Sequence, residues 1–115
     1  MSDNLEKAHS HRLNGQYQQA EALYRQILQE GANNSEACWG LGHTLMNGGD
    51  FEGCVEYFEK AIELEGQNSR YLIDLAKFQT MMGEYEKAEV LFSRVIELGE
   101  DDQLVNEAKK QLSYF

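Results

Sequence analysis

Apolar side chains recur along this chain at the spacing of one helical face. In the stretches that begin near residues 17, 51 and 85, they follow one another at i, i+3, i+4 and i+7, which is the period of an amphipathic α-helix. Proline is absent, and the helix-favouring residues Glu, Gln, Leu, Ala and Lys are common. The pattern predicts an all-α chain with helices over about 3–14, 17–30, 35–47, 51–64, 69–82, 85–98 and 102–113.

Short polar residues stand where several of these helices should begin. Ser35, Asp50, Ser69 and Asp102 are the N-caps that we expect, because a side-chain oxygen at this place accepts a bond from an unpaired backbone N–H.

The pattern repeats with a spacing of 34 residues, in segments 1–34, 35–68 and 69–102. Each segment has a glycine where its first helix should end, since glycine accepts the left-handed backbone conformation. A small-residue column and an aromatic column follow on the second helix, and stacked helix pairs would bury them. The columns are Gly15, Gly49 and Gly83; Ala20, Cys54 and Ala88; and Tyr24, Phe58 and Phe92.

These columns resemble the tetratricopeptide repeat family, whose repeats are 34 residues long. Leu41-Gly42 and Leu75-Ala76 stand where the family has its Leu-Gly, whereas its closing proline is replaced by Ala32, Gly66 and Glu100. The resemblance covers residues 1–102. It implies a right-handed α-solenoid of three antiparallel helix pairs in a single domain, 1–115, with a C-terminal capping helix over 103–115.

The two ends differ from the middle of the array. Leu104, Val105, Ala108 and Leu112 give the last segment one apolar stripe, as expected of a capping helix. The first helix is more polar at its core-facing places than the equivalent helix of the second repeat, and terminal repeats need a polar outer face.

A second stripe on the helix predicted over 35–47 indicates a binding surface. Trp39, His43 and their neighbours lie roughly 130° around the helix from the core-facing residues. In the family that the chain resembles, the first helices of the repeats line a concave groove, and these positions would line it. The predicted groove residues are Leu5, His9, Arg12, Leu13, Glu36, Trp39, His43, Met46, Asn47, Arg70, Ile73, Lys77, Thr80 and Met81.

The predicted groove is apolar with cationic neighbours, which matches an amphipathic helix or extended peptide with apolar anchors and some acidic residues. The alternative is that Trp39 and Met46 pack on neighbouring groove walls or under the C-terminal segment. Some relatives grip a chaperone's C-terminal carboxylate with a clamp of basic residues and asparagine. Of the corresponding places here only Arg70 has the needed character, and Asp74 would repel a carboxylate, so we reject that role.

Charge and composition exclude some classes of partner. Acidic residues outnumber basic ones 20 to 10, for a net charge of −10, which would repel nucleic acid and anionic membranes. No apolar run is long enough to cross a membrane and no secretion signal is recognisable, so we expect a cytoplasmic protein. Cys38 and Cys54 should be buried free thiols.

Catalytic chemistry is not expected. No nucleophile, base and orienting group share a pattern, and His9, His43 and Glu36 are too few for a zinc site. We therefore expect no cofactor, no metal and no enzymatic activity. The interpretation is a protein-interaction scaffold or adaptor. A chaperone or assembly factor, or a module of a larger enzyme, remains the alternative, and the open ends of the array allow weak self-association.

Overall fold

The computed structural model describes residues 2–115, and every regular element in that range is an α-helix. The chain divides into two compact units, one ending at Glu65 and the other beginning at Gly66. The right-handed superhelix and the single domain expected over all three helix pairs stay predictions.

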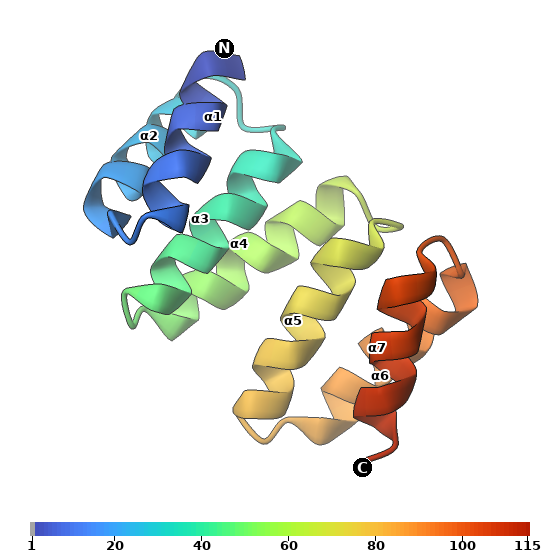
Figure 1. Ribbon diagram of the computed structural model, residues 1–115. Coiled ribbons are helices and arrows are strands. Elements are labelled where there is room, and N and C mark those ends of the chain that lie inside the picture. The colour runs from blue at the N-terminus through green and yellow to red at the C-terminus, as the bar shows by residue number, and fades with distance from the viewer. Residues whose placement is uncertain (1) are drawn as a thin grey trace. The chain divides into compact units, whose positions relative to one another are not determined.

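The first unit contains two helix pairs (Figure 1). The first pair is α1 (Ser2–Leu13) and α2 (Tyr17–Glu30), and the second is α3 (Ser35–Asn47) and α4 (Phe51–Leu64). Helix α2 packs against α3 as well as α1, and α1 also touches α3. The α1 and α3 helices therefore share one side of the unit.

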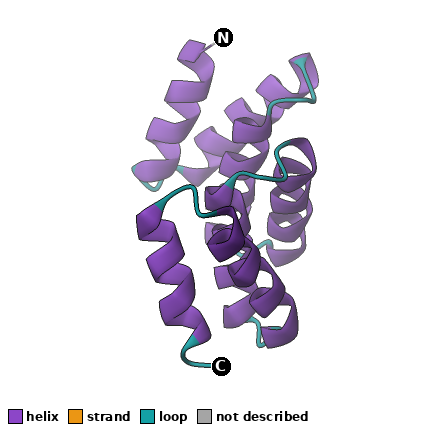
Figure 2. Ribbon diagram, turned by 90° about the vertical axis from the view of Figure 1, so that its right-hand side faces the viewer, coloured by secondary structure: helices purple, strands orange, loops and turns teal. Residues whose placement is uncertain are grey.

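The second unit contains one pair and the capping helix. Helices α5 (Ser69–Met81) and α6 (Tyr85–Leu98) pack against each other, and α7 (Asp102–Leu112) contacts both. Figure 2 shows that short loops join the successive helices. All seven predicted helices are confirmed, with bounds that differ by one residue at most from the periodicity-based ranges, whereas the capping helix expected over 103–115 ends at Leu112.

Glycines close the first helix of each pair. Gly15, Gly49 and Gly83 have φ angles of 77°, 89° and 78°, in the left-handed region that other residues rarely adopt. The reversal that begins each second helix therefore depends on glycine, as the repeat pattern predicts.

The predicted N-caps are right at one helix and wrong at three. Asp50 caps α4 by accepting a bond from Gly53 N. At the other three helices the cap is the preceding residue: Asn34 for α3, Asn68 for α5 and Asp101 for α7. Ser35, Ser69 and Asp102 are already helical. The asparagine or aspartate oxygen one place earlier reaches the N–H groups of the first turn, so it takes the role that we assigned to its neighbour.

The repeat columns form the core of each unit. In the first unit, Tyr24, Leu41 and Phe58 are buried with the small residues Ala20 and Cys54. In the second, Leu72, Phe92, Val95, Leu104 and Ala108 are buried. Cys38 and Cys54 are buried and free, as expected.

Candidate functional site on the first unit

Trp39 is the centre of a ring cluster between α1 and α3. Its side chain is half-buried. The guanidinium of Arg12 lies over its ring, 5.0 Å from the centroid. The His9 and His43 rings meet it edge-on, at centroid distances of 6.0 and 4.9 Å. Four predicted groove residues therefore come together on one face of the first unit.

A buried hydroxyl holds the α1 side of this cluster in place. Tyr24 has no exposed surface, and its hydroxyl oxygen accepts a hydrogen bond from Arg12 Nε at 3.1 Å. The same hydroxyl is hydrogen-bonded to His9 Nδ1. A buried tyrosine hydroxyl normally requires such partners, so the core residue fixes both side chains beside Trp39.

With a neutral imidazole on His9, the hydrogen bonds have one consistent arrangement of protons. If the Tyr24 hydroxyl donates to His9 Nδ1, then His9 Nε2–H donates to Glu36 Oε2, 2.8 Å away. Burial raises the pKa of the Tyr24 phenol, although Arg12 opposes that shift, so the hydroxyl stays protonated at neutral pH. The network thus extends from Arg12 through the core to Glu36 on α3.

Gly40 makes room for this network. A Cβ atom at this position would lie 2.5 Å from the Tyr24 hydroxyl oxygen, far inside van der Waals contact. Its missing side chain lets the tyrosine pass beside α3 to reach α1. Sequence reasoning placed Tyr24 in the core and missed its polar role. The available signal was tyrosine in a column whose other members, Phe58 and Phe92, lack a hydroxyl.

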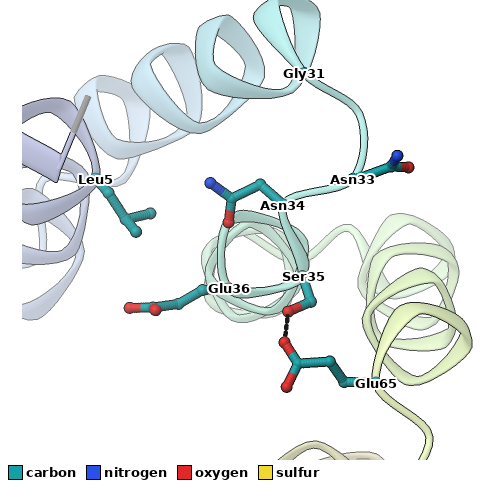
Figure 3. A pocket seen from close by; sticks show the side chains of 7 residues that line it. All are labelled: Leu5, Gly31, Asn33, Asn34, Ser35, Glu36 and Glu65. Atoms are coloured by element: carbon teal, nitrogen blue, oxygen red, sulfur yellow. Dashed lines mark hydrogen bonds between the residues drawn. The ribbon is translucent and has the colours of Figure 1, made fainter.

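A hollow of about 540 Å³ lies beside the cluster, at the loop between α2 and α3 (Figure 3). Leu5 from α1 and Glu36 from α3, both predicted site residues, line it from opposite sides. The hydroxyl of Ser35 donates a hydrogen bond to Glu65 in its wall. Its lining is Leu5, Gly31, Asn33, Asn34, Ser35, Glu36 and Glu65. The candidate site therefore combines a ring cluster with an adjoining open hollow.

The remaining predicted residues of the first unit lie at helix ends. Leu13 is 74% exposed at the end of α1, Asn47 is exposed at the end of α3, and Met46 is half-buried beside it. Leu13 and Asn47 therefore offer open surface at the ends of α1 and α3.

In the second unit the predicted residues differ in accessibility. Ile73 is completely buried, so the expectation that it offers an apolar surface is wrong, because packing leaves its side chain no contact with solvent. Lys77 is paired with Glu107 of α7 at 2.7 Å, and the Thr80 hydroxyl donates to the Ala76 carbonyl. Arg70 and Met81 are exposed. The structure does not gather these residues into one cluster.

The two thiols are poor nucleophiles. Burial raises the pKa of Cys54 from its ordinary value of 9.0 to about 12, and burial also raises that of Cys38. Within residues 2–115, no group of three or more His, Cys, Asp or Glu side chains is arranged to hold a metal ion. None of the described helices is long and apolar enough to cross a membrane.

Known proteins resemble the chain in both sequence and fold. BBSome complex member bbs-4 of Caenorhabditis elegans is 26% identical over 92 residues, which are 79% of this chain and 20% of the relative. The chain thus spans about a fifth of that relative's length.

Solved structures share the fold at low identity. The type III secretion chaperone SycD of Yersinia enterocolitica, in complex with a peptide of the translocator YopD, matches with a TM-score of 0.90 at 16% identity, over 98% of this chain and 89% of that chain. The Sgt2 TPR domain of Aspergillus fumigatus matches with a TM-score of 0.80 at 17% identity, over 97% and 78%.

A family model for the tetratricopeptide repeat matches residues 11–56 and 49–112, which is most of the chain. Together with the 34-residue columns and the helix pairs, this match shows that the chain belongs to the tetratricopeptide repeat family.

Proposed function

We propose that this protein is a non-enzymatic interaction scaffold that binds a peptide or helix of a partner protein on the α1/α3 face of its first unit. The observation that carries the proposal is the Trp39 cluster. A half-buried tryptophan ring with Arg12 over its face and two histidines at its sides combines the residue types that dominate binding energy at protein interfaces.

The cluster favours a segment with an apolar anchor and acidic neighbours. The Trp39 ring and Leu5 supply apolar contact, while Arg12 supplies a fixed positive charge beside them. The Tyr24 hydroxyl already holds the Arg12 side chain in place in the unbound protein. Less conformational entropy is therefore lost when a partner binds. The fold similarity to SycD, which was solved with a translocator peptide, agrees with peptide binding but shows the fold alone.

A display selection followed by affinity measurement tests the proposal. Peptides selected from a random library on the folded protein should share an apolar anchor with adjacent Asp or Glu. Trp39 is the only tryptophan in the chain, so its fluorescence reports directly on the site. Titration with a selected peptide should change the Trp39 emission.

Variants decide whether the site is the right one. Trp39→Ala should weaken binding of a labelled selected peptide by about 30-fold, the effect of a typical hot-spot residue. Val90→Ala, at an exposed position on α6, is the matched control and should bind normally. Equal affinity of wild type and a correctly folded Trp39→Ala would rule out this face as the binding site.

Two related roles remain as alternatives, and each has its own observation. SycD is a chaperone by its description; a chaperone role requires that the identified partner be insoluble without this protein, which co-expression tests. The 20% coverage of bbs-4 favours a module of a larger protein or assembly. We expect a cytoplasmic location. Because the net charge is −10, we expect neither nucleic acid nor an anionic membrane as a partner.

A further inference from the structure

The second unit has a hollow of its own, remote in sequence from the Trp39 cluster. Its volume is about 690 Å³. It lies where the end of α5, the start of α6 and the end of α7 meet. Its lining is Thr80, Tyr85, Glu86, Glu89, Gln111, Tyr114 and Phe115. Thr80 is the one lining residue that was also predicted for the groove, and the function proposed for the first unit does not use this hollow.

Aromatic rings form much of its wall. Tyr85 and Phe115 stand edge to face, with centroids 5.6 Å apart and planes inclined by 69°. Phe115 also meets the buried ring of Phe92 at 6.1 Å, which anchors it to the core. Tyr85 remains 57% exposed and Tyr114 70% exposed. Exposed rings that gather around one hollow form a contiguous apolar patch, and such patches often mark contact sites.

Two carboxylates stand beside these rings. Glu86 and Glu89 both line the hollow, and neither has an ion-pair or hydrogen-bond partner among the described residues. Lys87, which lies between them in sequence, is paired with Glu84 at 3.2 Å. The hollow is therefore both aromatic and negatively charged.

We infer that this hollow is a second binding site, which takes the lysine or arginine side chain of a basic segment in a partner protein. A cation is attracted to the negative face of an aromatic ring, and the attraction is strongest where water is partly excluded. Glu86 or Glu89 supplies the charge-assisted hydrogen bonds that an ammonium or guanidinium group needs. The aliphatic stem of either side chain packs against Tyr85 and Tyr114.

A second copy of this chain fits the hollow less well. Each copy carries a net charge of −10, so dimerisation through this surface would bring further acidic surface toward two unpaired carboxylates. A basic segment of another protein removes that repulsion. The site also differs in sign from the Trp39 face, which presents Arg12 and favours acidic segments.

Small probes test the site without a known partner. Backbone amide NMR signals of the whole chain are followed during titration with N-acetyl-lysine methylamide, the arginine equivalent, and N-acetyl-norleucine methylamide as the neutral isostere. The basic probes should shift signals of residues 85–89 and 111–115. The norleucine probe should bind about fivefold more weakly, which is the expected loss for an exposed cation–π contact.

Matched glutamate variants locate the charge. Glu89→Gln should weaken the lysine probe about fivefold, whereas Glu97→Gln, at an exposed place on the same helix, should leave binding unchanged. Three results would overturn the inference. They are equal binding of the lysine and norleucine probes, absence of shifts at these residues, and concentration-dependent shifts of the same residues without any probe, which would make a second copy the occupant.

Discussion

Gly40 of α3 faces the hydroxyl of Tyr24 so closely that a Cβ atom there would lie 2.5 Å from the oxygen. The glycine and the tyrosine therefore act together. The first lets the aromatic side chain pass, and the second holds Arg12 and His9 beside Trp39.

Replacing Gly40 should therefore disturb both the core and the candidate site. Gly40→Ala forces the Tyr24 ring out of its place, and overpacking of this kind costs about 1–3 kcal/mol of unfolding free energy. Chemical denaturation measures that loss, and Trp39 fluorescence reports the change at the site.

Gly31→Ala is the matched control for this substitution. Gly31 has open space around its Cβ direction and an extended backbone with φ −166°, so its replacement should cost almost nothing. A loss of stability in Gly31→Ala as large as in Gly40→Ala would contradict the steric explanation.

The Tyr24 hydroxyl should contribute to stability separately from the packing of its ring. Tyr24→Phe keeps the packing but leaves Arg12 Nε and His9 Nδ1 without their shared partner, so we expect a loss of about 1–2 kcal/mol in denaturation experiments. The Trp39 emission should change as well, because the side chains against its ring are released.

Tyr17→Phe serves as the comparison, since this half-buried tyrosine begins α2 and is not part of the Tyr24 hydrogen-bond network. It should leave both stability and Trp39 emission nearly unchanged. If both tyrosine variants behaved alike, the network would have no special role.

The Cys54 thiol predicts a loss of stability at alkaline pH. Burial raises its pKa from 9.0 to about 12, so between these values the unfolded chain releases a proton that the folded chain keeps. Below pH 9 the free energy of unfolding should therefore be unaffected by this thiol. Above pH 9 it should fall as pH rises, by at most about 1.4 kcal/mol per pH unit from this group.

Cys54→Ala isolates this contribution, because Ala20 and Ala88 hold the equivalent places in the other repeats. The unfolding free energies of the two proteins, measured from pH 8 to pH 10.5, should converge or cross as the wild type loses more. Parallel curves would show that the thiol keeps its ordinary pKa.

The start of α5 distinguishes the observed cap from the residue after it. Asn68 accepts bonds from the N–H groups of Arg70 and Tyr71, so Asn68→Ala should cost about 1 kcal/mol. Ser69 Oγ is buried with no hydrogen-bond partner among the described residues. Ser69→Ala should therefore be neutral or slightly stabilising in thermal unfolding, and a greater loss from Ser69→Ala than from Asn68→Ala would reverse the assignment.

Much of the fold is determined locally. A 34-residue repeat of apolar positions specifies where each helix lies, and glycine at residues 15, 49 and 83 specifies where each pair turns. These signals need only neighbours in sequence, because helix periodicity and a left-handed backbone angle are local properties. The caps were misplaced by one residue since several polar residues in a row can each serve, and only the backbone geometry selects among them.

The candidate site depended both on helical geometry, which the sequence determines, and on tertiary packing. Helical geometry alone put Trp39 and His43 on a face distinct from the core, and the structure brings His9 and Arg12 of α1 against that ring. The pairing of Lys77 with Glu107 could not be read from the repeat, because α7 departs from the repeat pattern. The burial of Ile73 likewise depends on tertiary packing rather than on its place in the repeat.

What the sequence by itself determined is thus the helices, their turns and the family. What only the tertiary structure decided is which side chains meet across helices. Tyr24 looked like an ordinary core aromatic, and its contact with Arg12 exists because Gly40, 16 residues further along, leaves its path open. Contacts of this kind depend on side-chain volumes from three helices at once, which no local pattern encodes.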